Sequence, residues 1–487
     1  MLPDVLLSEL VEAVHGVVVG SGRIPIHDVT HDSRRAGPGS LFVAVRGFAA
    51  DGHDFLSQAT ANGASAVCVE TRQDTVVPQL IVPDGRAALP VLAATVHHHP
   101  SRRLRVVGVT GTNGKTTVAY LLESIASAAG IVSAVVGTIG ARIAGRPVPV
   151  GRTTPESTDL QRLLAQMADE SVDIAAIEVS SHALALHRVD EVFFAVAAFT
   201  NLTQDHLDFH RDMDRYFAAK ASLFEDGRAG QAVIWVDDPY GSRLAADVTI
   251  PVTRVGLSSD ADVRATSIEV TPAGSSFELN IRETSRAIHL PLGGAFNIEN
   301  ALVAAACANV LGVAIDHIEA GLRNVAQIPG RFERVDAGQG FAVIVDYAHT
   351  PEGIDAAVSA ARAMSEAAVI VVIGAGGDRD RLKRPRMGLA AAAADIAIIT
   401  SDNPRSEDPL AIIAEVVAGA GDGEAELEVV PDRRSAIRTA LRSASTGDVV
   451  LILGKGHEQG QEVSGRVEPF DDRVVAREEL AKLEVAS

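Results

Sequence analysis

The sequence comprises 487 residues, of which 47% are hydrophobic and 4% aromatic, and its formal net charge is −20. This length predicts roughly two to four domains, and the acidic balance disfavours nonspecific binding to nucleic acid. Two cysteines, Cys68 and Cys307, are too few for a disulfide framework, and without a basic n-region or an uncharged run of about 18 apolar residues we expect a cytoplasmic protein with no signal peptide and no membrane span.

The first region, residues 1–100, is predicted to be mixed α/β. Residues 41–45 and 64–70 are apolar strands, and a helix is expected near residues 53–62. A further helix ends at His97-His98-His99-Pro100, where we place a domain boundary.

The second region, residues 101–329, begins with a β-branched strand at 104–110, a glycine loop and a helix that closes on Gly130. Further strands are expected at residues 132–138, 173–181 and 192–200, and helices over residues 297–313 and up to Gln327. The alternation of strand and helix predicts right-handed βαβ units on a parallel or mixed sheet.

The third region, residues 330–487, contains four apolar strands within residues 341–349, 367–377, 396–404 and 449–457. Each strand ends in polar, glycine-rich residues, and open α/β sheets bind ligands at such strand ends. The chain is therefore predicted to be a three-domain α/β protein, with a P-loop-type central ATPase domain and a Rossmann-like C-terminal domain.

The clearest local motif is the loop Gly111-Thr112-Asn113-Gly114-Lys115-Thr116-Thr117 between a strand and a helix. Backbone N–H groups of such a loop cradle phosphates, while Lys115 reaches the outer phosphates and Thr116 places a hydroxyl on Mg²⁺. The loop does not match the strict P-loop pattern G-x-x-x-x-G-K-[ST], because Val109 occupies the position of the first glycine. The alternative is a glycine-rich turn that binds nothing.

Other strand ends also bear polar groups. Glu178 ends a buried strand beside the phosphate loop and suits a metal ligand, although a solvated glutamate is the commoner case. His206 lies in the His- and Asp-rich stretch 200–208, for which a helix-capping loop is the alternative. In the third region, Arg379, Arg405, Lys455 and Glu458 lie at strand ends of one sheet and suit a zwitterionic amino acid.

Taken together, the motifs GTNGKTT, EVSSHAL, TNLTQDHLDFH, GRFE and DYAHTP, with Asn297, resemble those of the Mur ligase family in type and order, and the match covers nearly the whole chain. The resemblance implies a cell-wall enzyme that uses ATP and Mg²⁺ to add an amino acid to a UDP-sugar peptide through an acyl phosphate. Within the family, the chain is similar to ligases that extend UDP-N-acetylmuramoyl-L-alanyl-D-glutamate. The stretches DNPR and GKGHE resemble the form that selects meso-diaminopimelate.

The resemblance also implies roles for individual residues. The first domain would bind the UDP part of the substrate through His31, Asp32, Ser33 and the loop containing Phe48, Ala49 and Ala50, and Thr153, Thr154, Ser180 and Arg188 would contact the sugar-peptide. ATP would also meet Asn297, Arg331, Asp346 and His349. The catalytic set is Lys115, Glu178, His206 and Lys220, with Lys220 as a carbamate that joins Thr116 and Glu178 as metal ligands. Diaminopimelate would contact Arg379, Asp402, Asn403, Pro404, Arg405, Gly454 and Glu458.

Two departures from the family pattern affect sugar-peptide contacts: Leu186 replaces a frequent Gln, and Arg152 stands where Asn can occur. Four alternatives remain open: the same ligase with L-lysine or another diamino acid, a folylpolyglutamate-type synthetase, an ATP-regulated binding protein, and a catalytically idle member of the fold. The expected partners are small molecules alone, with no nucleic acid and no membrane insertion, and we expect a monomer.

Overall fold

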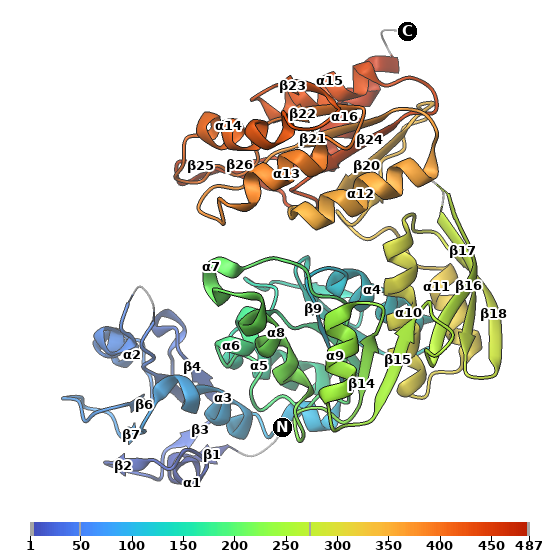
Figure 1. The fold of residues 1–487 in the computed structure, drawn as a ribbon. Coiled ribbons are helices and arrows are strands. Elements are labelled where there is room, and N and C mark those ends of the chain that lie inside the picture. The colour runs from blue at the N-terminus through green and yellow to red at the C-terminus, as the bar shows by residue number, and fades with distance from the viewer. Residues whose placement is uncertain (1–3, 48–49, 272–273, 485–487) are drawn as a thin grey trace.

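The computed structural model describes residues 4–47, 50–271 and 274–484. Within these ranges the strands form three main sheets, and each sheet takes its strands from one stretch of chain (Figure 1). These stretches fall inside the three regions expected from the sequence, whose boundaries at residues 100 and 329 remain predictions. Among the described residues, no helix combines the length and apolar character needed to cross a membrane.

The first sheet has the strand order β2-β7-β6-β5-β4, with only β2 antiparallel to its neighbour. Both faces are buried, since Leu41 packs with the α3 side of the sheet and Phe42 with the α2 side. The predicted helix at 53–62 begins as a 3-10 turn over Gly52–Phe55. The elements are β1 Val5–Leu6, α1 Leu10–Val14, β2 Val17–Val19, β3 Pro25–Ile26, β4 Asp28–Thr30, β5 Ser40–Val43, α2 Leu56–Ala61, β6 Ala66–Val69, β7 Gln79–Ile81 and α3 Gly85–Val96.

The central sheet has the order β11-β10-β9-β12-β8-β13-β14-β15-β16-β17-β18. Its middle strands are parallel and both edges are antiparallel, so the sheet is mixed. Its strands are β8 Arg105–Thr110, β9 Ser133–Gly137, β10 Gly140–Ile143, β11 Arg146–Val148, β12 Ile174–Glu178, β13 Val196–Phe199, β14 Ala232–Trp235, β15 Val252–Gly256, β16 Val263–Thr271, β17 Gly274–Ile281 and β18 Thr284–Leu290. Its helices are α4 Lys115–Ala128, α5 Ser157–Asp169, α6 Ser181–Ala185, α7 Leu207–His210, α8 Met213–Ala221, α9 Pro239–Asp247, α10 Ala295–Val310 and α11 Ile315–Arg323.

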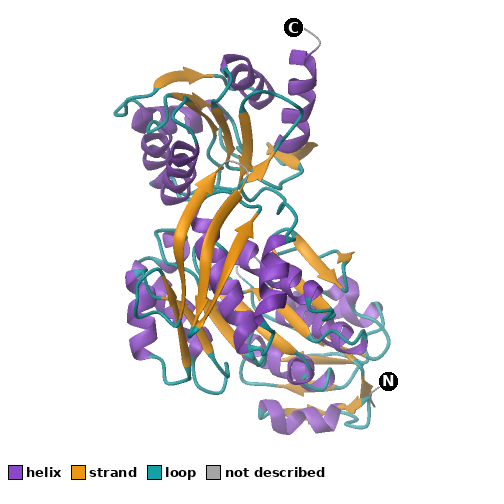
Figure 2. Cartoon of the chain, turned by 90° about the vertical axis from the view of Figure 1, so that its right-hand side faces the viewer, coloured by secondary structure: helices purple, strands orange, loops and turns teal. Residues whose placement is uncertain are grey.

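Strand order explains where the site forms. Because β8 lies between β12 and β13, and all three are parallel, the loops after Thr110, Glu178 and Phe199 emerge side by side. Helices α4, α10 and α11 cover one face of this sheet. Figure 2 shows β16–β18 as long strands that extend from the central body toward the third domain.

The third sheet has the order β19-β20-β24-β21-β22-β23, and its strands are parallel except β19. Helices α12–α14 pack on one face and α15 and α16 on the other (Figure 1). The alanine run at 390–394 is helical only to Ala391, because a turn then leads into β22. The elements are β19 Glu333–Arg334, β20 Ala342–Asp346, α12 Pro351–Met364, β21 Val369–Ile373, α13 Lys383–Ala391, β22 Ile396–Ile399, α14 Pro409–Ala420, β23 Glu426–Val429, α15 Arg433–Ser443, β24 Val449–Leu453, β25 Gly460–Val463, β26 Arg466–Pro469 and α16 Asp472–Glu484.

Candidate active site

The phosphate-loop motif lies between the end of β8 and the start of α4, as the sequence predicts. Gly114 has φ 88°, and a Cβ there would lie 2.2 Å from Asn300 Oδ1. A Cβ at Gly111 would lie 1.9 Å from Thr200 Oγ1. The two glycines therefore let the loop pack against α10 and the loop after β13 while its N–H groups stay at the helix N-terminus.

Two lysines converge on this loop from different helices. Lys115 Nζ donates to the carbonyl oxygens of Gly111, at 2.9 Å, and Thr112, at 2.8 Å. Lys220 Nζ, from α8, donates to the same Gly111 oxygen at 2.8 Å and is 1% exposed. Burial lowers the pKa of both amines, and for Lys220 the neighbouring Lys115 lowers it further. Lys220 is therefore buried against the phosphate loop, although it lies on a helix.

Glu178 ends β12 as a fully buried carboxylate beside the loop. Its two oxygens accept hydrogen bonds from the N–H and the hydroxyl of Thr138, both at 2.9 Å. Gly137 leaves room for the carboxylate, since a Cβ there would lie 2.0 Å from Glu178 Oε1. The strand end is thus built around a fixed acidic group rather than a solvated one.

The loop 200–206 packs against the phosphate loop rather than only capping a helix. Thr203 N donates to Thr112 Oγ1 at 3.0 Å, and the Tyr216 hydroxyl lies 3.2 Å from the same oxygen. His206 has a left-handed backbone with φ 55°. Its Nε2 is 3.4 Å from Asp205 Oδ2, and burial lowers its pKa, which the nearby Asp205 carboxylate opposes.

The third domain supplies the opposite wall of this site. Arg331 Nη2 donates to Thr116 Oγ1 at 3.0 Å, and its guanidinium lies over the Tyr347 ring. Asp346 accepts from the N–H groups of Phe332 and Ala348, at 2.6 Å and 2.8 Å, and burial raises its pKa. The cavity between these walls has a volume of about 470 Å³. The predicted residues that line it are Thr112, Asn113, Gly114, Lys115, Thr116, Thr117, Thr153, Glu178, Ser180, His206, Asn297, Arg331, Asp346 and His349.

Contacts between domains include residues that the sequence analysis did not select. Asp205 Oδ1 lies 3.7 Å from Lys383 Nζ, and Asp205 Oδ2 lies 4.0 Å from His349 Nε2. Burial opposes ionisation of Asp205, but the surrounding histidines and Lys383 lower its pKa. Arg386 Nη1 donates to Gln204 Oε1 at 2.7 Å. The basic run 383–386 at the start of α13 was the available signal for this contact.

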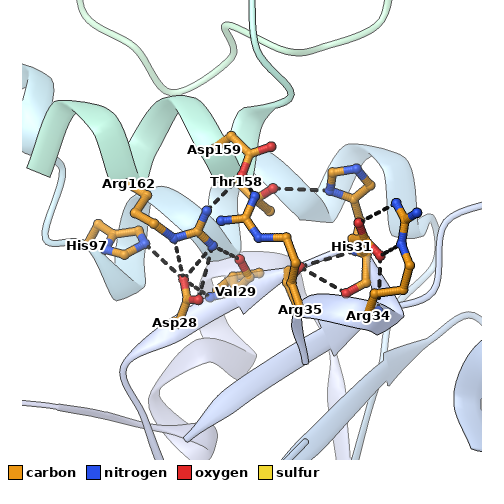
Figure 3. Close-up of polar contacts among 11 residues, drawn as sticks. Asp28, Val29, His31, Arg34, Arg35, His97, Thr158, Asp159 and Arg162 are labelled. Atoms are coloured by element: carbon orange, nitrogen blue, oxygen red, sulfur yellow. Dashed lines mark hydrogen bonds and ion pairs between the residues drawn. The ribbon is translucent and has the colours of Figure 1, made fainter. Parts of the chain in front are cut away.

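The residues expected at the UDP end lie where the first and central domains meet. Figure 3 shows this junction, in which Arg162 of α5 bonds Asp28 at 2.8 Å and Arg35 bonds Asp159 at 2.6 Å. His31 Nδ1 is 3.1 Å from Thr158 Oγ1 (Figure 3). His31 also borders a cleft of about 370 Å³ together with Arg152 and Glu156.

Other predicted residues of the first domain lie apart from that cleft. Ser33 Oγ bonds Gln58 Oε1 at 2.8 Å, and the Asp32 carboxylate pairs with Arg34 at 2.7 Å. Ala50 O accepts from Gly47 N at 2.9 Å, whereas Phe48 and Ala49 lie outside the described residues.

Thr154, Ser180 and Arg188 form a polar chain between the cleft and the phosphate loop. Thr154 Oγ1 bonds both Glu178 O, at 2.8 Å, and Ser180 Oγ, at 3.3 Å. Thr153 Oγ1 lies 3.2 Å from Thr138 Oγ1. Leu186, at the C-terminal end of α6, has no polar group for this chain.

The Glu156 carboxylate links this region to the first domain. It pairs with Arg188, Arg152 and Arg86, at 2.9, 3.0 and 3.1 Å. Since Arg86 lies on α3 of the first domain, one carboxylate joins the two domains and is surrounded by three cations. Excess positive charge of this kind favours an anionic ligand.

The residues assigned to amino-acid recognition form a separate cluster in the third domain. Arg405 has φ 52°, and its Nη1 donates to Gly377 O at 2.7 Å. Its nearest carboxylate is Glu462, at 3.6 Å from Nε, whereas the Asp408 side chain caps α14. Arg379 is exposed and bonds Asp378 O. Arg405 therefore makes no ion pair with Asp408, the second acidic residue after it in the sequence.

A buried lysine organises the rest of this cluster. Lys455, fully buried, donates to Asn403 Oδ1 and Glu458 Oε2, both at 3.2 Å. The Asn403 amide in turn donates to Glu458 Oε2 at 2.7 Å. Burial raises the pKa of Asp402, which directly precedes Asn403 and Pro404. Gly454 N donates to Asp346 O at 3.1 Å. The last contact connects this cluster to Asp346, which lines the cavity at the phosphate loop.

The fold and site together define a nucleotide-binding α/β enzyme whose phosphate loop faces a separate C-terminal α/β domain across the cavity. The chain matches the models of three protein-family domains. They are "Mur ligase family, catalytic domain" over residues 25–107, "Mur ligase middle domain" over residues 109–308, and "Mur ligase, glutamate ligase domain" over residues 330–456. The chain belongs to the Mur ligase family, which confirms the resemblance.

Curated relatives match along almost the full length. A UDP-N-acetylmuramoyl-L-alanyl-D-glutamate--2,6-diaminopimelate ligase of Geobacillus thermodenitrificans is 45% identical over 480 residues, which cover 97% of this chain and 98% of the relative. A ligase of the same name from Streptomyces coelicolor is 44% identical over 492 residues, with 98% and 96% covered.

Solved structures agree with the predicted fold. A UDP-N-acetylmuramoyl-L-alanyl-D-glutamate--2,6-diaminopimelate ligase structure matches with a TM-score of 0.71 and 31% identity, covering 99% of each chain. A folylpolyglutamate synthase of Mycobacterium tuberculosis matches with a TM-score of 0.62 and 20% identity, covering 81% of this chain and 94% of that one. The second likeness shows a shared fold alone.

Proposed function

We propose that this protein is an ATP-dependent ligase that joins meso-diaminopimelate to UDP-N-acetylmuramoyl-L-alanyl-D-glutamate in peptidoglycan synthesis. The main support is the match at 45% identity over 97% of the chain to a relative that bears this activity in its name. The cavity between the phosphate loop and the third domain, next to a cluster suited to an amino acid, supports the same reaction.

In the proposed reaction, the D-glutamate side-chain carboxylate attacks the γ-phosphorus of ATP, which forms an acyl phosphate and releases ADP. The amine of diaminopimelate then attacks the acyl carbon, the C–O bond to phosphate breaks, and the amine loses a proton. No covalent enzyme nucleophile is needed, because ATP supplies the activation. Lys115 and the loop N–H groups would stabilise the transferring phosphoryl group, and Arg331 lies close enough to join them.

The residues near the loop fit Mg²⁺. Glu178 offers a hard carboxylate that Thr138 holds in place, and Thr116 offers a hydroxyl. Lys220, whose pKa is lowered by burial, suits the carbamate proposed for it. Among the described residues no three His, Cys, Asp or Glu side chains form a metal cage, and Mg²⁺ commonly binds through one or two carboxylates plus substrate phosphates. When bound, it would neutralise phosphate charge.

Diaminopimelate would occupy the cluster around Lys455. Its distal carboxylate would pair with Arg405 and Arg379, and Asn403 and Glu458 would receive the adjacent ammonium. Lysine lacks that carboxylate and would leave Arg405 without its proposed ligand partner. We further propose that the enzyme works in the cytoplasm as a monomer.

The decisive measurement is the specificity constant for diaminopimelate, L-lysine and ornithine in wild type, Arg405→Ala and the control Arg466→Ala, an exposed arginine on β26. Wild type should prefer diaminopimelate by up to about 10⁴. Arg405→Ala should reduce that ratio about 10- to 100-fold, because a charged hydrogen bond is lost. Equal use of lysine by wild type would refute the substrate assignment, and an unchanged ratio in Arg405→Ala would refute the role of Arg405.

The same assay separates the other possibilities. A folylpolyglutamate-type synthetase would add glutamate to a folate, and a binding protein would release no phosphate in the presence of all three substrates. We expect phosphate release only when both the UDP-linked dipeptide and the amino acid are present.

A further inference from the structure

A fully buried arginine lies between the two loops that bear Arg379 and Arg405. Arg384, on α13, is 1% exposed. Its Nη2 donates to Glu407 Oε1 at 2.7 Å and to Gly376 O at 3.2 Å, and its Nη1 donates to Glu407 Oε2 at 3.0 Å. The guanidinium therefore grips one carboxylate with both nitrogens and also contacts the backbone of the glycine-rich loop.

Glu407, which Arg384 holds in place, connects the Arg405 loop to the Arg379 loop. It lies just after Arg405, yet its Oε1 accepts the N–H of Asp378 at 2.6 Å. A second hydrogen bond joins the same two loops, because the Asp378 carboxylate accepts from the Ser406 hydroxyl at 2.7 Å. Hydrogen bonding to Arg384 lowers the pKa of Glu407 to about 2, so the pair remains charged at neutral pH.

Backbone contacts complete the connection. Gly377 N donates to Asn403 O at 2.8 Å, and Gly377 O accepts from Arg405 Nη1 at 2.7 Å. A Cβ at Gly377 would lie 1.9 Å from Pro404 O, so the two loops touch without space for a side chain. The relative position of the two loops is thus set by a charged pair beneath them and by backbone contact between them.

We infer that Arg384 and Glu407 are positioning residues for the amino-acid site: together they hold the loops of Arg379 and Arg405 at the spacing that one distal carboxylate requires. This inference rests on the proposed function and names no group that touches substrate. Two arginines can bind one carboxylate only if their spacing is fixed, and a displacement of about 1 Å in a positioned contact can cost about 10²-fold.

The chain offers a matched control for this inference. Glu415, on α14, also accepts from Arg384, at 2.8 Å from Nη1, and its side chain is 27% exposed against 23% for Glu407. Glu415 is paired with Arg381, but within the described part of the chain it accepts no hydrogen bond from the backbone of either loop. Glu407→Gln and Glu415→Gln therefore each remove one negative charge that pairs with Arg384. Only Glu407→Gln also disturbs the connection between the two loops.

The experiment measures KM for each of the three substrates, kcat, and the ratio of specificity constants for diaminopimelate and lysine. Glu407→Gln should raise KM for diaminopimelate about 10- to 100-fold and lower the ratio, while KM for ATP and the UDP-linked dipeptide stays within about two-fold. Glu415→Gln should behave as wild type. Equal effects in the two variants, or a rise in all three KM values together, would overturn the inference.

A second variant guards against simple misfolding. Arg384→Lys retains the charge but loses bidentate geometry, so we expect the thermal midpoint to fall modestly and KM for diaminopimelate to rise as in Glu407→Gln. An unchanged KM in a folded Arg384→Lys would also overturn the inference. If wild type prefers lysine, the proposed substrate is wrong and the inference is overturned with it. If wild type prefers diaminopimelate and the variants leave its KM unchanged, the inference alone is wrong.

Discussion

Lys115 and Lys220 share a single backbone acceptor, the Gly111 carbonyl oxygen, although they lie on different helices. Two ammonium groups this close repel each other, and burial removes the water that would screen them. The arrangement favours a neutral amine on one of them, and the pKa of Lys220 is the one lowered well below its usual range. A neutral amine is the form that reacts with CO₂, so local physics supports the carbamate that the family resemblance implies.

We therefore predict that Lys220→Ala loses most ligase activity, by roughly 10²-fold or more, because an anionic ligand is removed from a preorganised site. Wild type equilibrated with ¹³C-bicarbonate should show a carbamate carbon signal that Lys220→Ala lacks and that Lys482→Ala, a change at an exposed lysine on α16, retains. Short carboxylates should partly restore activity to Lys220→Ala. Full activity without a carbamate signal would contradict the prediction.

At the scale of elements, the sequence predicted most of the structure that positions the site. Strands such as β8, β12 and β21 are continuous apolar runs, because both faces of a parallel sheet are buried. Strands β16 and β17 were not predicted. They are partly exposed, and their polar and apolar residues do not form the uninterrupted runs of the central strands.

Motifs at strand ends were predictable, whereas their partners were not. The phosphate loop and Glu178 follow from strand, glycine and charge patterns. Contacts such as Arg331 with Thr116 join residues 215 positions apart, and no local pattern specifies such a pair. The buried Lys455 and the Thr138 contact to Glu178 belong to the same group, since they depend on how loops from different strands meet.

Helix α13 makes two kinds of contact, because Arg384 binds Glu407 within the third domain while Arg386 reaches Gln204 of the central domain. We predict that Arg386→Ala lowers kcat about two- to ten-fold, because one exposed contact between the closed domains is lost and such contacts are weak. Arg362→Ala, which removes contacts within the third domain only, is the control. The measurement is kcat of both variants by steady-state kinetics. Equal kcat values for Arg386→Ala and Arg362→Ala would show that the Arg386 contact does not support domain closure.

Across the whole molecule, buried titratable groups link protonation to folding. Burial lowers the pKa of His210 and of His457 to about 4. Because an unfolded histidine titrates near about 6.5, the unfolded chain binds protons first, and the stability that these groups contribute above that pH is lost as the pH falls toward 4. Glu299 acts oppositely: burial, then Asp237 and Asp238, raise its pKa to about 7, so its contribution is present below about 4.5 and lost as the pH rises through 7.

The central domain allows this linkage to be measured, because Trp235 is the only tryptophan of the chain and is buried in β14. Urea unfolding can be followed by Trp235 fluorescence. We predict that the urea concentration at the midpoint of unfolding decreases as the pH is lowered from 6.5 to 4. His210→Gln should make that fall shallower, since one native group that resists protonation is removed, whereas Glu299→Gln should make it steeper, since the opposing group is lost. His317→Gln, at an exposed position on α11, is the control. If the plots of urea midpoint against pH are parallel for wild type and His210→Gln, burial of this histidine does not govern the acid sensitivity of the domain.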